Sequence, residues 1–494
     1  MISSERIFEK DLYEIWINQN FESNLQTIDG DEIAVLDAGQ HNSDTTGPDF
    51  HNARIRIGNL TFVGDIEIDS DYHDWKSHGH HLNNKYNKVV LHLSLTNKFN
   101  QPYVYSKDGR KIPSIKLADH VEVQQVKSIS KKIESYNSNH EHTLRCIESN
   151  SIIDLRSKEK FVLDLGTERY KKKCMKFYDR LKELKYISEL QLKEPVIKYE
   201  LGEEFRNKKY THNDFKEKDL WLQLLYENVF EALGYSKNKS IMMKLAQAAN
   251  INFINSFLNA GKTDKQKLEA ALFGVSGLLP DAEKLPDNHK SEYTKKIFEE
   301  WKSLQSKYDG ETFNETDWNF FRLRPQNFPT IRIAGGIEIL QSLVNDNLVS
   351  SLIKKIKEIR NLNVLINSLR SVFVVRSHGF WEDHYVFDKK ASTKIKYFVG
   401  AGRADEIVIN VLLPFFTVYF EVFGNQDLAK KVFKLYSIYK QKNDNKIVRE
   451  VSETLGLNRV SNRTVYSQGM IELFRHFCSK GKCLECEIGK QVFN

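Results

Sequence analysis

Apolar and polar residues alternate along the first part of the chain, whereas apolar residues recur every three or four positions along the rest. Residues 7–21 carry apolar side chains at helical spacing and predict a short helix. From residue 25 to residue 117 the pattern is that of strands. A short Gly58-Asn59 connection predicts a hairpin of residues 53–58 and 60–69, and further strands are expected at residues 89–95 and 111–117.

Beyond about residue 120 the pattern is overwhelmingly helical. Helices are expected over residues 155–185, 220–258, 293–307, 333–369, 405–423, 427–441 and 467–478. A polar run at residues 137–142 is the expected linker. The predicted fold class is therefore α+β, with a mixed α/β module at residues 1–120 and a mainly α-helical region at residues 121–494 that ends in a cluster of cysteines.

Composition supports folded domains in a reducing compartment. The 494 residues are 40% hydrophobic and 12% aromatic, which is enough for large cores and excludes global disorder. Five cysteines cannot build a disulfide framework, and the opening segment has no apolar signal core. The most apolar run, residues 407–423, is interrupted by Asn410, Pro414 and Glu421 and predicts a core helix, not a membrane span. We therefore expect a cytoplasmic protein without a membrane partner.

Net charge leaves the kind of partner open. The chain has 73 basic and 66 acidic residues, a formal charge of +7, which permits a nucleic-acid partner without requiring one. The sequence contains no GxSxG, P-loop, HExxH or dinucleotide-binding motif. The enzyme classes that depend on those motifs are therefore unsupported.

Candidate chemistry begins with a row of carboxylates. In the segment GDIEID, the strand period of two places Asp65, Glu67 and Asp69 on one face and two isoleucines on the other. Asp49 lies one hairpin away, just before the strand pair. Stacked carboxylates repel one another unless water, a base or a cation offsets them, and oxygen ligands on rigid elements suit a hard divalent ion such as Mg²⁺ or Mn²⁺. The alternative is a solvated sheet face.

Histidines follow directly after this strand. His73, His78, His80 and His81 are four of the chain's 15 histidines and fall within nine positions. Imidazoles beside acids supply general bases or softer metal ligands. The alternative is a polar surface loop.

Two resemblances attach to these residues. The segments GPDFHNARIRIG, GDIEID and DWKSHGHHLNNKYNKVVLH, together with the later FEALGYSKNK, RLRPQNFPTIRIA and FWEDHY, resemble a bacterial domain-of-unknown-function family over nearly the whole chain. The order Asp49, strand, Glu67-Ile68-Asp69, His73 is similar to the PD-(D/E)XK nuclease core, closest to the branch of the very-short-patch-repair endonuclease. This second resemblance covers about the first quarter of the chain.

The nuclease resemblance implies metal-assisted phosphodiester hydrolysis. By analogy, Asp49 and Glu67 hold Mg²⁺ or Mn²⁺ with the backbone carbonyl of the residue after Glu67. Asp69 stands where many members have the lysine that activates water, so His73, His78 or His80 would take that role.

Arginines supply candidate phosphate contacts. Arg322, Arg324 and Arg332 surround two prolines that favour an extended loop, an arrangement that suits nucleic-acid binding. The alternative is pairing with acids of neighbouring helices. Arg54 and Arg56 share a strand face and either contact phosphates or cover the solvent side of the hairpin.

A second metal site is predicted at the C-terminus. Cys478, Cys483 and Cys486 have C-x4-C-x2-C spacing, with His476 two residues before the first. Clustered thiols in a reducing compartment suggest zinc or an iron–sulfur cluster, with His476 or one of the two other cysteines, 146 and 174, as the fourth ligand. The alternative is three unligated thiols.

Three functions remain open at this stage. The first is a metal-dependent nuclease or nuclease-derived protein acting on DNA or RNA. The second is a non-catalytic nucleic-acid-binding or scaffold protein with a vestigial metal site. The third is a metal-dependent hydrolase of a non-nucleic substrate.

Overall fold

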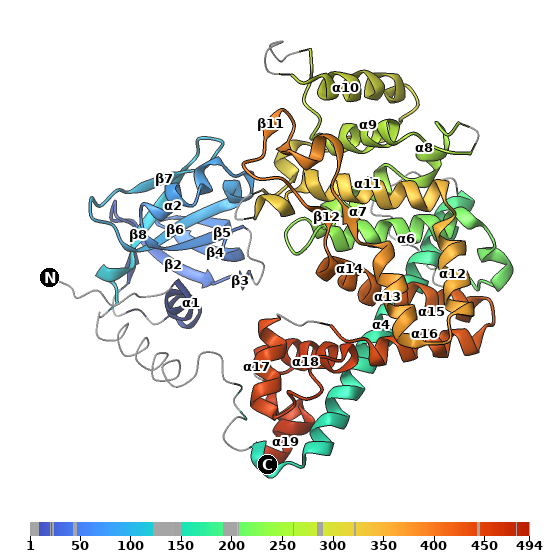
Figure 1. Ribbon diagram of the computed structural model, residues 1–494. Helices are drawn as coiled ribbons and strands as arrows, with labels where there is room; N and C mark the ends of the chain where they lie inside the picture. The colour runs from blue at the N-terminus through green and yellow to red at the C-terminus, as the bar shows by residue number, and fades with distance from the viewer. Residues whose placement is uncertain are drawn as a thin grey trace. The chain divides into compact units, whose positions relative to one another are not determined.

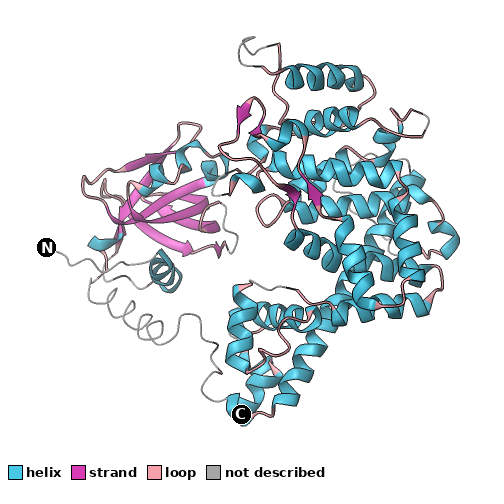
Figure 2. Ribbon diagram, in the orientation of Figure 1, coloured by secondary structure: helices cyan, strands magenta, loops and turns pink. Residues whose placement is uncertain are grey.

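The computed structural model divides the chain into two compact units, residues Met1–Thr143 and Leu144–Asn494. It describes residues 9–19, 21, 24–42, 47–121, 144, 146, 150–190, 205, 207–259, 261–283, 290–320, 323–441, 445–480 and 482–493. The linker expected at residues 137–142 lies outside these ranges. The first unit contains the large β-sheet and the second is almost entirely helical (Figures 1 and 2), which confirms the predicted α+β class.

An eight-stranded mixed sheet forms the first unit, in the order β1-β2-β4-β5-β6-β8-β7 with β3 paired to β4. The predicted hairpin is confirmed, because β4 and β5 pair antiparallel through the turn at Gly58 and Asn59. Strands β5, β6 and β8 then run parallel to one another. The strands are β1 (Leu25–Gln26), β2 (Glu32–Asp37), β3 (Gln40–His41), β4 (Phe50–Ile57), β5 (Leu60–Asp71), β6 (Val89–Thr96), β7 (Tyr103–Tyr105) and β8 (Lys111–Lys116).

The two faces of this sheet carry different chemistry. Helix α1 (Glu9–Asn18) packs its apolar side chains, among them Leu12 and Trp16, against Ile66 and Ile68 of β5 and the apolar residues of β6. Since successive side chains of a strand point to opposite faces, the acidic residues of β5 lie on the other face. A short helical segment covers that face and consists of α2 (Asp74–Ser77), η1 (His80–Leu82) and η2 (Asn84–Lys88).

The second unit is built around helix α6 (Lys218–Leu233), which is buried on almost every side. The other α-helices among its described residues are α4 (Leu155–Leu190), α7 (Lys239–Ala248), α8 (Ile251–Asn255), α9 (Lys265–Ser276), α10 (Glu292–Gln305), α11 (Pro329–Asn345), α12 (Leu348–Glu358), α13 (Leu362–Val372), α14 (Ala401–Ile407), α15 (Leu413–Val422), α16 (Gln426–Ile438), α17 (Lys446–Leu455), α18 (Thr464–His476) and α19 (Glu487–Phe493). Short strands β9 (Val375–Arg376), β10 (His384–Val386), β11 (Lys389–Lys390) and β12 (Tyr397–Val399) form two small ribbons.

Two predicted long helices are in fact divided. The segment 220–258 breaks after Gly234 and again at Asn250, whose side chain accepts a hydrogen bond from Phe253 N–H and begins α8. The segment 333–369 likewise forms α11, α12 and α13. Helices α9, α17 and α19 were not predicted. The spacing of apolar residues predicted most of the segments that are helical but not where each helix begins and ends, because helix ends depend on single capping side chains.

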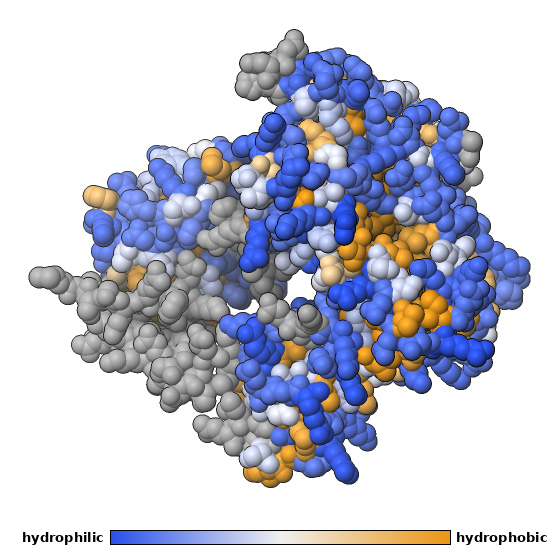
Figure 3. All heavy atoms as spheres, in the orientation of Figure 1, coloured by the Kyte–Doolittle hydropathy of each residue, from blue (hydrophilic) through white to orange (hydrophobic). Residues whose placement is uncertain are grey.

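The apolar run 407–423 lies in the core of the second unit. It forms α14, a π-helical turn at Val408–Leu412 and α15, and Pro414 stands at the start of α15, where a missing N–H costs least. Across the described ranges, no helix combines the length and apolarity needed to cross a bilayer. Hydrophilic residues cover most of the described surface in the view of Figure 3.

Candidate metal centre

Three buried carboxylates follow one another along the same face of β5. Asp65, Glu67 and Asp69 are 7%, 4% and 1% exposed. Imidazoles offset all three: His51 Nδ1 lies 3.2 Å from Asp65 Oδ1, and His80 Nε2 lies 3.1 Å from Glu67 Oε1. The predicted acidic row is therefore buried against histidines and is not a solvated face.

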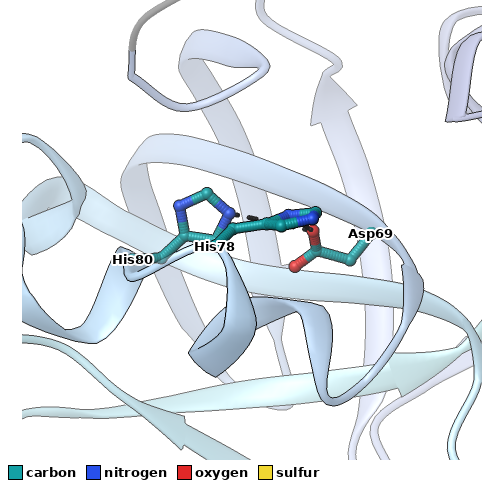
Figure 4. A group of neighbouring side chains, drawn as sticks. All are labelled: Asp69, His78 and His80. Atoms are coloured by element: carbon teal, nitrogen blue, oxygen red, sulfur yellow. Dashed lines mark ion pairs between the residues drawn. The ribbon is translucent and has the colours of Figure 1, made fainter. Parts of the chain in front are cut away.

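Asp69 is the point at which the most histidines meet. Its Oδ1 lies 3.4 Å from His78 Nδ1 and 3.8 Å from His80 Nε2. The ligand atoms of these three residues all lie within 4.8 Å of one another, and Figure 4 shows the side chains converging from β5 and from the segment that covers it. Two ligands that are each about 2.1 Å from a tetrahedral metal lie about 3.4 Å apart, so the spacing fits a single ion.

The segment after β5 is folded so that His78 and His80 point the same way. Helix α2 ends at His78, and Gly79 has φ +77°, a left-handed conformation that turns the chain between the two histidines. The His80 ring packs against Trp75 and Tyr86, with centroid distances of 5.4 Å and 4.1 Å. Trp75 Nε1 in turn donates to Tyr105 O at 3.0 Å, so both the backbone and the ring packing fix His80.

One nitrogen of the site is well suited to a metal. His80 Nε2 is buried, and its approach to Glu67 lacks hydrogen-bond geometry although the two atoms are 3.1 Å apart. A buried imidazole nitrogen that is directed at two carboxylates without a hydrogen bond costs free energy, and a cation between these groups would remove that cost. The residues present therefore fit a bound divalent ion.

A histidine that the sequence analysis did not single out holds the second oxygen of Asp69. His92, fully buried on β6, places Nε2 3.1 Å from Asp69 Oδ2 and Nδ1 3.1 Å from Ser114 Oγ of β8. This leaves Oδ1 for the site while Oδ2 is fixed by its neighbour. A signal was present, since one histidine stands in the otherwise apolar strand VVLHLSL, but only the parallel register reveals its partner.

The histidines also keep Asp69 ionised. Burial raises the pKa of its carboxyl group, but the neighbouring imidazoles of His78, His80 and His92 lower it by more, so the pKa lies well below the usual range. A carboxylate that stays charged in the interior is a ready metal ligand. Its charge is balanced by the polar groups around it.

The donor set is softer than the oxygen ligands that the nuclease resemblance implied, and it contains two of the histidines that the sequence offered as softer ligands. Two imidazole nitrogens and one carboxylate oxygen suit Zn²⁺, Fe²⁺ or Mn²⁺ better than Mg²⁺, which prefers oxygen ligands. In this set the imidazoles of His78 and His80 would stand where the resemblance implied a carbonyl oxygen. The nuclease resemblance and the observed donor set agree in implying a divalent metal.

Asp49 and Glu67 lie next to each other, as the resemblance requires. Asp49 N–H donates to Glu67 Oε2 at 3.1 Å, and Asp49 Oδ2 accepts from Ile68 N–H at 2.8 Å. Asp49 Oδ1 also accepts from the Tyr13 hydroxyl of α1 at 2.5 Å. The sharing of one cation by Asp49 and Glu67 stays a prediction. In the structure Asp49 ties α1 and β4 to the strand that carries the site.

The remaining candidate residues lie in other surroundings. His73 is exposed and its Nδ1 pairs with Asp71 Oδ1 at 2.9 Å, away from Asp69. Arg322 lies outside the described residues, Arg324 is exposed, and Arg332 is only 6% exposed. The nucleic-acid role of these arginines stays a prediction.

Access to the acidic face is narrow. Asp69 and His80 are almost completely buried, whereas 27% of the His78 side chain is exposed. His78 is therefore the edge of the site that faces solvent. Two surface hollows of about 400 and 550 Å³ lie elsewhere, the first between α4, α6 and α8 and the second beside β1 and η3 (Leu117–Asp119).

Comparison with known proteins adds a family but no activity. No curated protein and no solved structure matches the chain. The model of the family described as "Protein of unknown function (DUF2851)" matches residues 9–192 and 196–445, a range that includes the carboxylates, the histidines and most of the helical unit. The domain-of-unknown-function resemblance is thereby confirmed: the chain belongs to the DUF2851 family.

Proposed function

We propose that the first unit is a metal-dependent hydrolase of phosphodiester bonds in nucleic acid, with Asp69, His78 and His80 as the metal ligands. The observation that carries this proposal is the convergence of these three side chains on one buried point. A divalent metal bound there would neutralise charge on a phosphate and lower the pKa of a bound water.

The neighbouring side chains have separate tasks in this proposal. His92 fixes Asp69 Oδ2, so that Oδ1 faces His78 and His80. Glu67 is the next carboxylate along the strand, with Oε1 beside His80, and would accept the proton that a water loses. His78 is partly exposed and lies at the edge from which a substrate would approach.

Basic side chains on the same sheet face favour a nucleic acid as substrate. Strand pairing places Arg54 opposite Val63 and Arg56 opposite Thr61. Residues 61 and 63 share the odd-numbered face of β5 with Glu67 and Asp69. Both arginines are exposed, so they could hold a phosphate backbone that runs along β5 towards the site.

Metal content and cleavage can be tested on the same variants. Purified full-length chain is loaded with Mn²⁺ or Zn²⁺, and cleavage of plasmid DNA and of single-stranded DNA and RNA oligonucleotides is followed. Asp69→Asn, His78→Ala and His80→Ala should each lose bound metal and cleavage together. His73→Ala is the matched control, because His73 is a nearby exposed histidine outside the group, and it should retain both.

Burial favours a second candidate, a metal site that only stabilises the fold. Asp69 and His80 are 1% and 8% exposed, which resembles a closed structural site. In that case metal raises the thermal midpoint in wild type, but no substrate is cleaved. Salt-sensitive nucleic-acid binding without cleavage would then indicate a non-catalytic binding protein. Metal binding that survives all three substitutions would contradict both candidates.

A further inference from the structure

Three of the five cysteines are held in two consecutive turns between α18 and α19. Cys478 begins η11 (Cys478–Lys480), and Cys483 begins η12 (Cys483–Glu485). Lys482 N–H donates to Phe477 O at 2.9 Å, and Cys486 N–H donates to Cys483 O at 3.1 Å. These hydrogen bonds fold the C-x4-C-x2-C segment back on itself.

Helix α19 closes tightly over this segment. A Cβ atom added to Gly489 would lie 2.0 Å from Cys483 O, so only glycine permits this approach. The N–H groups of Ile488 and Gly489 form hydrogen bonds to the Cys486 sulfur. Backbone N–H groups directed at a cysteine sulfur stabilise a thiolate ligand.

A fourth cysteine reaches the same place from the other end of the helical unit. Cys146 precedes η4 (Asn150–Ile152), which contacts α19. Cys146, Cys478 and Cys486 pack into one hydrophobic cluster with residues of α4, α17 and α18. The thiols of Cys486, Cys146 and Cys483 all lie near the thiol of Cys478. The four sulfurs therefore gather at one partly buried site.

We propose that Cys146, Cys478, Cys483 and Cys486 hold a [4Fe–4S] cluster. Four thiolates are the ligand number that this cluster takes. Within the described part of the chain, no three cysteine sulfurs lie within 4.8 Å of one another. Two thiolates on a single zinc ion lie about 3.8 Å apart, whereas a cubane of four irons holds its cysteine sulfurs at wider spacing.

A basic residue offsets the negative charge of such a cluster. Lys158 of α4 is only 5% exposed, and its ammonium group lies near the thiol of Cys146. A buried cation near a thiolate ligand lowers the cost of the negative charge there. The cluster would also cross-link the start of the helical unit to its end.

The other two ligand candidates lie elsewhere. Cys174 is buried in a different hydrophobic cluster, with its Sγ 4.0 Å from Pro414 O. His476 Nδ1 lies 3.4 Å from Glu472 Oε1, and half of its side chain is exposed. Cys146 therefore replaces His476 as the fourth ligand.

The full-length chain should be purified without oxygen and analysed for iron, acid-labile sulfide and zinc. About four irons and four sulfides per chain, with a broad visible absorption that dithionite bleaches, are expected. Chemical reconstitution with iron and sulfide should restore these values if the cluster is lost during purification. The absence of iron after reconstitution would overturn the cluster, and one zinc per Asp69→Asn chain that is lost when Cys478→Ala is added would assign zinc to this site instead.

Single cysteine substitutions then identify the ligands. Cys146→Ala, Cys478→Ala, Cys483→Ala and Cys486→Ala should each remove most of the iron. Cys174→Ala should retain it and serves as the matched control. Asp69→Asn should also retain it, which separates this site from the centre in the first unit. Circular dichroism reports whether each variant folds. If a variant does not fold, the metal analysis of wild type still tests the cluster. Full iron content in a folded Cys146→Ala variant would contradict the ligand set.

Discussion

His92 Nε2 lies 3.1 Å from Asp69 Oδ2 in the interior of the first unit, on a strand parallel to that of the aspartate. The parallel register pairs Glu67 with His92 and Asp69 with Ser94, so all four side chains lie on one face of the sheet. His92 contacts no solvent and offers no nitrogen to the candidate ion. It therefore acts on the centre by orienting a ligand.

We expect His92→Leu to weaken metal binding by about 10- to 100-fold, as loss of an outer partner of a metal ligand typically does. The substitution removes the partner of Asp69 Oδ2 and leaves all three proposed ligands in place. Calorimetric titration of Mn²⁺ or Zn²⁺ into metal-free protein measures the affinity. His92→Gln is the control, because its amide can still donate to Asp69. Equal affinities for His92→Leu and wild type would exclude the orienting role.

The sequence was sufficient to predict the faces of β5 but not the contacts across the sheet. Alternation placed Asp65, Glu67 and Asp69 on one side, because burial on a strand has a period of two. The role of His92 depends on which residue of β6 lies beside which residue of β5. That register is set by tertiary packing and cannot be read from a single strand.

Similar limits apply to the helical unit. Spacing predicted the C-terminal thiol site from Cys478, Cys483 and Cys486, but it could not choose among His476 and the two distant cysteines for a fourth ligand. The proposed choice of Cys146 depends on α19 meeting η4 just before α4 (Figure 1), a contact between the two ends of the unit. Local patterns do not contain such contacts.

Two glycines should respond differently to substitution by alanine. A Cβ atom at Gly64 would lie 2.4 Å from Val90 Cγ1 and 2.5 Å from Lys88 O, so β5 and β6 must separate. At Gly79 there is open space, and only the positive φ of 77° opposes a side chain, at a cost of about 1–2 kcal/mol. We expect Gly64→Ala to lower the thermal midpoint much more than Gly79→Ala.

Substitution of Gly79 also tests metal binding independently of stability. Gly79 lies between two proposed ligands, so Gly79→Ala should weaken metal affinity in a chain that still folds. Gly109→Ala is the control, because Gly109 also has positive φ and open space but lies in the turn between β7 and β8, outside the segment that carries the two histidines. A Gly79→Ala variant that binds metal as Gly109→Ala does would argue against the ligand role of His78 and His80.

The stability of the helical unit should depend on pH through Glu269 on α9. Burial raises the pKa of its carboxyl group to about 7, although Lys265 at 3.9 Å partly opposes this effect. The pKa of Glu269 in the folded protein lies above its ordinary value, so the folded state favours the protonated carboxyl group. The contribution of this protonated group to stability is fully present below about pH 4.5 and is lost as the pH rises through about 7.

Glu269→Gln should therefore stabilise the protein at pH 8 by up to about 3 kcal/mol and have little effect at pH 4.5. Thermal midpoints of wild type and variant across this range test the expectation. Glu292→Gln on α10 is the control, since the Glu292 side chain is exposed and should leave the pH profile unchanged. A constant difference between Glu269→Gln and wild type at every pH would show that the effect is not one of ionisation.

Arg332 and Arg324 belong to one motif but should differ in what they do. Arg332 donates to the Phe398 carbonyl oxygen, to the Asn327 side chain and, at 2.9 Å, to the Tyr235 hydroxyl, and so joins α11 to β12 and to the end of α6. Arg332→Met leaves one buried and two part-buried acceptors without this donor and should cost about 3 kcal/mol or more. Arg324 is exposed, so Arg324→Ala should change stability by less than about 0.5 kcal/mol.

For nucleic-acid binding, we expect the Arg324 substitution to have the larger effect and the Arg332 substitution the smaller. If the loop contacts phosphates, Arg324→Ala weakens binding to all sequences alike and reduces the slope of log affinity against log salt by about one. Folded Arg332→Met protein should keep the wild-type slope, because the Arg332 guanidinium is taken up by protein acceptors. Fluorescence anisotropy with a labelled oligonucleotide at several salt concentrations measures both slopes. An unchanged slope for Arg324→Ala would remove this loop from the nucleic-acid surface and leave Arg54 and Arg56 of β4 as the basic residues to test.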